Sequence, residues 1–514
     1  MSKVTEADMK DVELNELDPE KQPMTDGGAG NSPIGTEKNG SVTVKIADDS
    51  DVKFTGLSKE ELMKVAGTPG WVRTRWVLLI LFWIGWIGML AGAIVIIVKA
   101  PRCKSLPEMN WWNYGPLYKI WDVDAFTEAG GLKGVVEKID DLSQLKVKGV
   151  VMGPLHTVQK DQPNTLNFMA INPEVGTNGE FESLVDKAHK KGLSVVLDLT
   201  PNYKGSNLWF DKILVSSIAE KLKVAMSHWM DLGVDGFQLG GIDENFVDQS
   251  IWHSLKNTIK DNRTDGAKQR VLIGVSMQNT SAAVSTLHNI STVDLLLSRV
   301  LQPNVTGGQW AQAIQQLYES RNQTGLAWNI GSKTEGHLGT LVGPTLVKLY
   351  QMLLFTLPGT PVFSYGDEIC LKSDVNATHN PKMVWDSLEH TEEKNETVKM
   401  MSEHRRSCHS FFKTLSDLRG KERSLQHGDF LLLHNSTTSL AFLRQWDQSE
   451  RYLTALNLGK KSVTLRLSHA HLPEHATVLL STDPKTHPPE KSVQLGDLKL
   501  EAEEALLLHF PYTA

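Results

Sequence analysis

Cysteine is scarce in this chain, with 3 residues among 514. A dense disulfide framework is therefore excluded, and because the number is odd, at least one thiol is free or pairs outside the chain. A surplus of basic residues is also missing, since 53 Lys+Arg stand against 60 Asp+Glu, for a formal net charge of −7. This balance excludes nucleic-acid binding as the main task, because neutralising phosphates requires such a surplus.

A long apolar stretch without any charge runs from Trp76 to Val98. A helix of this length, at about 1.5 Å per residue, covers the ~30 Å hydrocarbon core of a bilayer. The stretch is apolar on every face, unlike most buried helices of soluble proteins, and it is too long and begins too late for a cleaved signal peptide. We predict a single transmembrane signal-anchor helix over residues 76–98.

The direction of this helix is not set by its flanking charges, because basic residues lie close to it on both sides. Asn-x-Ser/Thr sequons favour one direction, since one, at Asn39, precedes the helix and the others follow it. The candidate N-glycosylation sites after the helix are Asn262, Asn279, Asn289, Asn304, Asn322, Asn376, Asn395 and Asn435. We predict a single-pass type II glycoprotein with a cytoplasmic N-terminus and an extracellular C-terminus.

Residues 1–75 are rich in Asp, Glu, Lys, Gly and Ser and poor in large apolar residues. Such a segment buries too little surface to offset its chain entropy, so we predict a mostly disordered cytoplasmic tail. The exception is Thr55–Gly67, where Ser58 followed by Glu61 matches a capping box. This pattern favours a short juxtamembrane helix over a helix that docks a partner.

Three glycines, Gly85, Gly88 and Gly92, lie near one stripe of the predicted transmembrane helix. Gly88 and Gly92 form a small-xxx-small pattern, which lets membrane helices approach closely. We predict that this face packs against another helix.

Cys103 stands in the predicted extracellular stalk, residues 99–114. No other cysteine is near it in the sequence, and an exposed thiol in an oxidising compartment is well placed for a disulfide to another chain. Cys370 and Cys408 then pair with each other or stay buried.

Strand-like and helix-like runs alternate over residues 115–424. Lys148–His156 and Leu193–Asn202 are rich in β-branched residues, and Phe181–Gly192 between them is amphipathic at helical spacing. This order predicts an α/β fold, a TIM (β/α)8 barrel with parallel strands inside and helices outside. Residues 425–514 instead hold short strands between polar turns, which is typical of a C-terminal antiparallel β-sandwich.

The barrel region resembles the α-amylase family of glycoside hydrolases. The resemblance extends from about Leu117 to Ala514, because that family also carries a C-terminal β-sandwich. It is carried by four blocks in the family's order, namely Gly131–His156, Val195–Tyr203, Gly233–Gly241 and Leu354–Ile369.

The catalytic carboxylates of that family are missing from these blocks. Retaining glycosidases need two carboxyl groups about 5–5.5 Å apart. Gly240 stands where the resemblance places the nucleophile, and Val275 stands where it places the general acid. The third acid has no substitute either, because no Asp occurs between Asp294 and Asp367.

Other acids nearby do not replace them. Asp243 and Glu244 lie beyond the expected strand end, and we expect them in an exposed loop. Asp198 is a single carboxylate and cannot play both roles. The family's inserted subdomain after the third strand is also missing, so we predict a catalytically dead barrel without catalytic residues, cofactor or metal.

The anchor, the amylase-like unit without catalytic acids and the juxtamembrane cysteine together resemble the heavy (ancillary) subunits of heteromeric amino-acid transporters. The broadly expressed cell-surface antigen type is more similar than the kidney type, which keeps the inserted subdomain. The resemblance implies that Cys103 forms a disulfide with a multi-spanning light chain and that the glycine face packs on it. It further implies delivery of that light chain to the plasma membrane, amino-acid exchange and a link with integrins.

Two other functions stay open on the sequence alone. One is a membrane-anchored α-glucosidase, and the other is an adhesion or integrin-signalling co-receptor.

Overall fold

The computed structural model describes residues 58–99, 104–243, 248–261, 268–303, 305–320, 323–373, 380–385 and 396–512. The chain divides into two compact units, residues 1–100 and 101–514. Within the described part of the first unit no residue is buried. The core residues of the second unit all lie between Trp112 and Phe510, so this unit encloses its own core.

The described part of the first unit contains two helices, α1 (Lys59–Ala66) and α2 (Pro69–Lys99). The predicted capping box is present, because Ser58 Oγ accepts from the Glu61 backbone N–H at 3.3 Å while Glu61 Oε2 accepts from the Ser58 N–H at 3.2 Å. Helix α2 is, within the described ranges, the one helix long and apolar enough to cross a membrane. It begins at Pro69, before the predicted span, because proline is well suited to a first helical turn.

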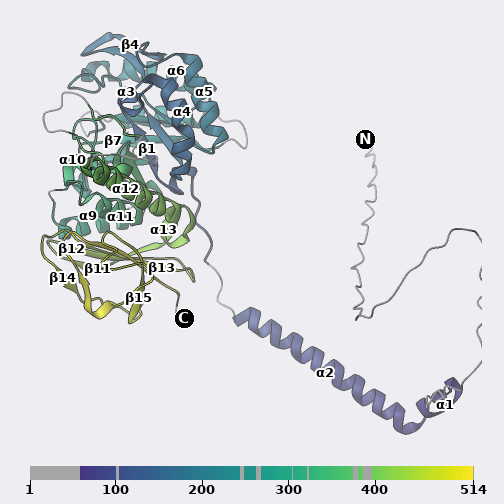
Figure 1. Ribbon diagram of the computed structural model, residues 1–514. Helices are drawn as coiled ribbons and strands as arrows, with labels where there is room; N and C mark the ends of the chain where they lie inside the picture. Colours follow the sequence, from purple (N-terminus) through teal and green to yellow (C-terminus); the bar gives the residue numbers. More distant parts are fainter. Residues whose placement is uncertain are drawn as a thin grey trace, which may run out of the picture. The chain divides into compact units, whose positions relative to one another are not determined.

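Eight parallel strands form the barrel of the second unit, drawn in blue to green in Figure 1. Their order is β8-β7-β6-β5-β2-β1-β10-β9, and a parallel bridge between Leu296 and Leu326 closes the ring. The strands are β1 (Leu117–Ile120), β2 (Gly149–Met152), β5 (Ser194–Asp198), β6 (Gly236–Gly240), β7 (Val271–Val275), β8 (Leu295–Leu297), β9 (Ala327–Trp328) and β10 (Thr360–Ser364). The predicted (β/α)8 barrel is confirmed.

Helices alternate with these strands along the chain. The longer ones are α4 (Gly131–Gln144), α5 (Asn178–Lys190), α6 (Val215–Asp231), α7 (Gln249–Asp261), α8 (Ser281–Ser291), α9 (Gly307–Ser320), α11 (Val347–Thr356) and α12 (Glu396–Lys421). Short segments complete the region, namely α3 (Val123–Phe126), α10 (Leu338–Val342), α13 (Arg423–His427), the 3-10 turn η4 (Asp367–Ile369) and the hairpin of β3 (His156–Gln159) and β4 (Gln162–Ile171).

Side chains of alternate strand residues fill the barrel. Leu117, Val151 and Val196 belong to the interior cluster, whereas Tyr118 and Val195 belong to the cluster beneath the helices. This is the period-two alternation of a strand buried on both faces. By the same period Asp198, Gly240 and Val275, which end β5, β6 and β7, are on the inward side and lie at the carboxyl-end mouth of the barrel.

The C-terminal region is an antiparallel sheet of order β11-β12-β13-β18-β15-β16, with a two-stranded sheet, β14-β17, as its second layer. On β12, Leu440 and Phe442 join the barrel core, while Ala441 and Leu443 face the second layer. The strands are β11 (Asp429–Asn435), β12 (Ser439–Gln445), β13 (Arg451–Asn457), β14 (Val463–Leu465), β15 (His475–Ser481), β16 (Ser492–Gln494), β17 (Leu498–Leu500) and β18 (Ala505–Phe510).

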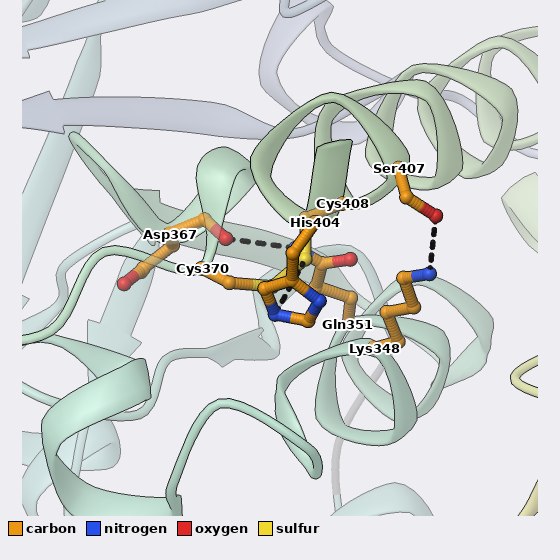
Figure 2. The surroundings of a disulfide bond; sticks show 7 residues. All are labelled: Lys348, Gln351, Asp367, Cys370, His404, Ser407 and Cys408. Carbon is orange, nitrogen blue, oxygen red and sulfur yellow. Dashed lines mark hydrogen bonds between the residues drawn. A yellow bond between two sulfur atoms is a disulfide. The ribbon is translucent and has the colours of Figure 1, made fainter. Parts of the chain in front are cut away.

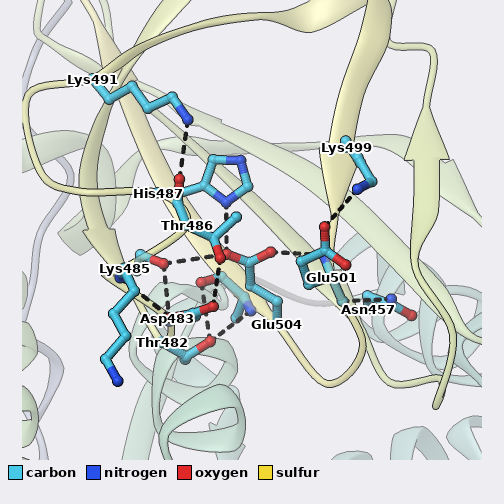
Figure 3. A network of polar contacts seen from close by, with 12 residues as sticks. Asn457, Thr482, Asp483, Lys485, Thr486, His487, Lys491, Lys499, Glu501 and Glu504 are labelled. Atoms are coloured by element: carbon cyan, nitrogen blue, oxygen red, sulfur yellow. Dashed lines mark hydrogen bonds and ion pairs between the residues drawn. The ribbon is translucent and has the colours of Figure 1, made fainter.

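One buried carboxylate connects the loops at one end of this region (Figure 3). Glu504 is 1% exposed, and its Oε1 lies 2.7 Å from His487 Nδ1 while its Oε2 accepts from the Glu501 backbone N–H at 2.7 Å. Asn457 donates to the Glu501 carbonyl at 2.7 Å. A buried carboxylate is tolerated only with such partners, so this network fixes the loops before β16 and β18.

Cys370 and Cys408 form a disulfide, the first of the two outcomes that the sequence left open (Figure 2). The bond joins the residue after η4 to the middle of α12, and the two cysteines are 38 positions apart. Both are nearly buried, at 6% and 0% exposure.

Replacing both cysteines by alanine is expected to lower the free energy of unfolding by about 2–4 kcal/mol, because the cross-link restricts the unfolded chain. Urea unfolding of the fragment 104–514 measures this. Wild-type protein unfolded under reducing conditions is the control and should approach the double variant. Equal stability of the oxidised wild type and the variant would contradict the prediction.

Candidate functional site

Asp198, the last residue of β5, lies at the mouth of the barrel and is 5% exposed. Its Oδ1 accepts from Thr200 Oγ1 at 2.5 Å and from the Thr200 backbone N–H at 2.9 Å. Gln238 on β6 donates its amide Nε2 to Asp198 Oδ2. Both carboxylate oxygens are therefore engaged by the protein itself.

Lys119, on β1, is the charged partner of this carboxylate. Burial raises the pKa of Asp198, and the positive charge of Lys119 opposes that rise. Burial likewise lowers the pKa of Lys119, and the negative charge of Asp198 opposes the fall. The two side chains thus stabilise each other's charged forms inside the barrel.

Gly240 ends β6 at the position of the missing nucleophile. Its N–H donates to Thr200 Oγ1 at 2.8 Å, and its carbonyl accepts from Trp209 Nε1 at 2.9 Å. A Cβ at this position would lie 3.0 Å from Thr200 Oγ1 and 3.4 Å from Leu208 Cδ1. The site therefore has no room for a longer side chain unless its neighbours shift.

Val275 pairs with Gly240 in the parallel register, so the structure brings together the two positions from which catalytic groups were predicted to be missing. Val275 is partly buried and packs against the interior cluster. Asp243 lies in the loop after β6, as expected, but it is partly buried and not exposed, and Glu244 lies outside the described residues.

The loop after the third barrel strand is short, as predicted. Only Leu199–Leu214 separates β5 from α6. Tyr203 in this loop donates its hydroxyl to the His156 carbonyl at 2.9 Å. The His156 ring lies 3.2 Å from the Pro201 carbonyl, and burial lowers the pKa of His156 to about 4. A neutral imidazole therefore donates to the Pro201 carbonyl, which ties the loop to the start of β3.

Two buried acids next to β10 were not singled out by the sequence. Asp367 accepts from the backbone N–H groups of Ser364 at 2.8 Å and Leu338 at 3.0 Å, and burial raises its pKa to about 8. Glu368 accepts from the Tyr118 hydroxyl at 2.6 Å, and burial raises its pKa to about 7. The sequence signal that could have indicated them is a pair of adjacent acids near the end of the apolar block Leu354–Ile369.

The predicted contact residues of the first unit lie on α2. At each of Gly85, Gly88 and Gly92 an added Cβ would meet no described atom of the first unit within 4 Å. Cys103 lies outside the described residues.

Three of the predicted sequon asparagines are described, and all three are exposed: Asn279, Asn289 and Asn435. The other five lie outside the described residues: Asn262, Asn304, Asn322, Asn376 and Asn395.

Two family models match the sequence. Solute carrier family 3 member 2 N-terminus matches residues 42–118, and Alpha amylase, catalytic domain, matches residues 119–220. Among solved structures, an α-amylase from Geobacillus thermoleovorans complexed with acarbose has a TM-score of 0.60 at 19% identity, over 79% of this chain and 100% of its own. A trehalose-6-phosphate hydrolase from Bacillus licheniformis also reaches 0.60, at 14% identity, over 78% of this chain and 100% of its own. These likenesses show the fold.

Curated relatives match along the whole chain. The amino acid transporter heavy chain SLC3A2 of Oryctolagus cuniculus is 45% identical over 100% of both chains, and that of Mus musculus is 43% identical over 100% of both. The amino acid transporter heavy chain SLC3A1 of Rattus norvegicus is 24% identical over 92% of this chain and 89% of its own.

Fold and sequence together define a class of protein in which one long apolar helix precedes a glycoside-hydrolase-like barrel and an antiparallel sheet region. More narrowly, this chain belongs to the family of amino acid transporter heavy chains.

The raised pKa values of Asp367 and Glu368 predict a pH-dependent stability. In the folded state these acids keep their protons up to about pH 8 and about pH 7, whereas the unfolded chain releases them near pH 4. Their contribution is therefore fully present below about pH 4 and is lost as pH rises toward 8, by at most about 1.4 kcal/mol per pH unit for each group.

Glu368→Gln should flatten this decline between pH 5 and pH 8, since the amide oxygen still accepts from Tyr118 but carries no titrating proton. Chemical unfolding at a series of pH values measures the slope. Glu182→Gln, on the exposed side of α5, is the matched control and should leave the slope unchanged. A variant slope equal to that of the wild type would refute the assignment.

Proposed function

We propose that this chain is a type II membrane glycoprotein that brings a multi-spanning amino-acid transporter light chain to the plasma membrane and stabilises it there, supporting amino-acid exchange. The observation that carries the proposal is the match along the full chain, at 43–45% identity, to relatives named amino acid transporter heavy chains. A link with integrins stays a prediction from the sequence resemblance.

The transport route belongs to the light chain in this proposal. Between Trp76 and Val98 the helix α2 carries no charged side chain, and a single apolar helix offers no polar path across a bilayer. Its contribution is contact, for which the open face of Gly85, Gly88 and Gly92 is suited because small residues let two helix backbones approach closely.

The covalent contact is assigned to Cys103. Since Cys370 and Cys408 are joined to each other, Cys103 is the cysteine left for a bond outside the chain. The exposed Asn279, Asn289 and Asn435 support the same orientation, because glycans are added on the extracellular side of a membrane protein. In this orientation Cys103 lies in an oxidising compartment, where such a disulfide persists.

We also infer that the barrel does not hydrolyse glycosides. Gly240 and Val275 carry no carboxyl group, and the carboxylate of Asp198 is engaged by Thr200 and Gln238. A retaining mechanism needs two free carboxyl groups facing one cleft. These features of the barrel mouth favour a role of the barrel as a scaffold.

Cys103→Ser should remove the high-mass band that wild-type protein, co-expressed with its light chain, gives on a non-reducing gel. Surface delivery should fall without disappearing, because helix packing remains. Cys370→Ala with Cys408→Ala is the matched control and should leave the high-mass band in place. If Cys103→Ser keeps that band, the covalent assignment is wrong.

Gly240→Asp should restore no turnover of α-glucosides and should lower the free energy of unfolding by about 2 kcal/mol or more, since the carboxylate would be forced against Thr200 and Leu208. Gly496→Asp, where an added Cβ meets no atom within 4 Å, is the control and should change stability by less than about 0.5 kcal/mol. Turnover by the wild-type fragment 104–514 would overturn the scaffold assignment.

A further inference from the structure

A cavity of about 500 Å³ lies beside the disulfide in the second unit, between the N-terminal half of α12 and the segment that follows η4. Its walls include Leu371, Met400 and Met401 on the apolar side and Lys372, His404 and Arg405 on the polar side. Cavities of this size hold small organic ligands. Neither the barrel mouth nor the glycine face of α2 shares a residue with it.

The apolar wall comes from one face of α12. Thr397, Met400, Met401 and His404 line the cavity at the spacing i, i+3, i+4 and i+7, which places them on the same side of a helix. Met400 is 58% exposed and Met401 is 52% exposed. Methionine side chains are flexible and polarisable, so this wall can adapt to an alkyl chain.

Cys370 forms part of the wall and fixes its position. It is bonded to Cys408 on α12, and Cys408 Sγ lies 3.6 Å from His404 Nε2 (Figure 2). The disulfide therefore keeps the segment after η4 against the helix face that carries the methionines. The cavity is bounded by elements that are covalently joined, so its two walls cannot separate freely.

The polar wall carries two basic side chains, Lys372 and Arg405, beside His404, and none of the described lining residues carries a carboxylate. Burial lowers the pKa of His404, and the positive charges of Lys348 and Arg405 lower it further. The acid Glu503 stands nearby, where its Oε2 accepts from the hydroxyl of the lining residue Thr345 at 3.3 Å. The lining cations thus favour an anionic head group on a ligand.

We propose that this cavity binds an amphiphilic carboxylate, a molecule with one unbranched alkyl chain and one carboxylate head. The chain lies along Met400, Met401 and Leu371, and the head is held by Arg405 and Lys372. Arginine pairs with a carboxylate through two parallel hydrogen bonds, whereas a neutral or cationic head gains nothing from this wall. The site is independent of the proposed transporter role.

The test uses the fragment 104–514 with ¹³C-methyl-labelled methionine, because that unit encloses its own core. The probe is decanoate below its micelle concentration. Its titration should shift the methyl resonances of Met400 and Met401 to saturation, while those of Met169 and Met277, which are exposed elsewhere on the unit, stay in place. Met400→Leu and Met401→Leu assign the two signals.

Charge recognition is tested with ligands that share the same alkyl chain but differ in head group, and with one variant that reverses the charge of a lining residue. Decanoate should bind at least tenfold more tightly than 1-decanol or decyltrimethylammonium, and Arg405→Glu should weaken decanoate binding at least tenfold. Lys399→Glu is the matched control, because Lys399 lies on α12 outside the cavity lining, and it should leave the affinity within twofold.

Three results would each overturn the proposal. They are equal affinity for decanoate and decanol, equal shifts at all exposed methionines, and decanoate affinity in Arg405→Glu equal to that of the wild type.

Discussion

The hydrogen bonds around Asp198 order the carboxyl end of the barrel. Thr200 donates to the carboxylate and accepts from the Gly240 N–H, and the Gly240 carbonyl accepts from Trp209, so a single chain of bonds runs from β5 through β6 and back to the loop after β5. A buried carboxylate without such partners is costly. The contacts that satisfy Asp198 also bring Thr200 close to Gly240, so a side chain at Gly240 would require its neighbours to shift. The polar groups at the ends of β5 and β6 thus satisfy one another.

Much of this arrangement could be predicted, because parallel strands buried on both faces give long apolar runs whose ends are easily recognised. Asp198, Gly240 and Val275 each end a strand, as their blocks indicated. The period of two then places them at one mouth. The open glycine face followed from helical spacing in the same way. In both cases a local repeat determines where a side chain lies.

Features that depend on distant packing could not be predicted. The disulfide joins residues 38 positions apart, and no local pattern states whether two thiols will meet. The burial of Asp367 and Glu368 depends on how β10, α10 and β1 come together, since their partners Leu338 and Tyr118 lie far away in the chain. The pairing of a six-stranded sheet with a two-stranded one also depends on which face of β12 meets the barrel.

In the proposed function, both units act by contact with a partner and not by transport or catalysis of their own. A membrane helix without charge between Trp76 and Val98 can carry no solute by itself. At the carboxyl ends of β5 and β6, the carboxylate of Asp198 is engaged by Thr200 and Gln238. In the proposed function the solute path lies in the light chain, and this chain contributes surface to the contact. The bonds among Asp198, Thr200, Gly240 and Trp209 suit that role, because they tie the loop after β5 to both strands and so fix the surface at this end of the barrel.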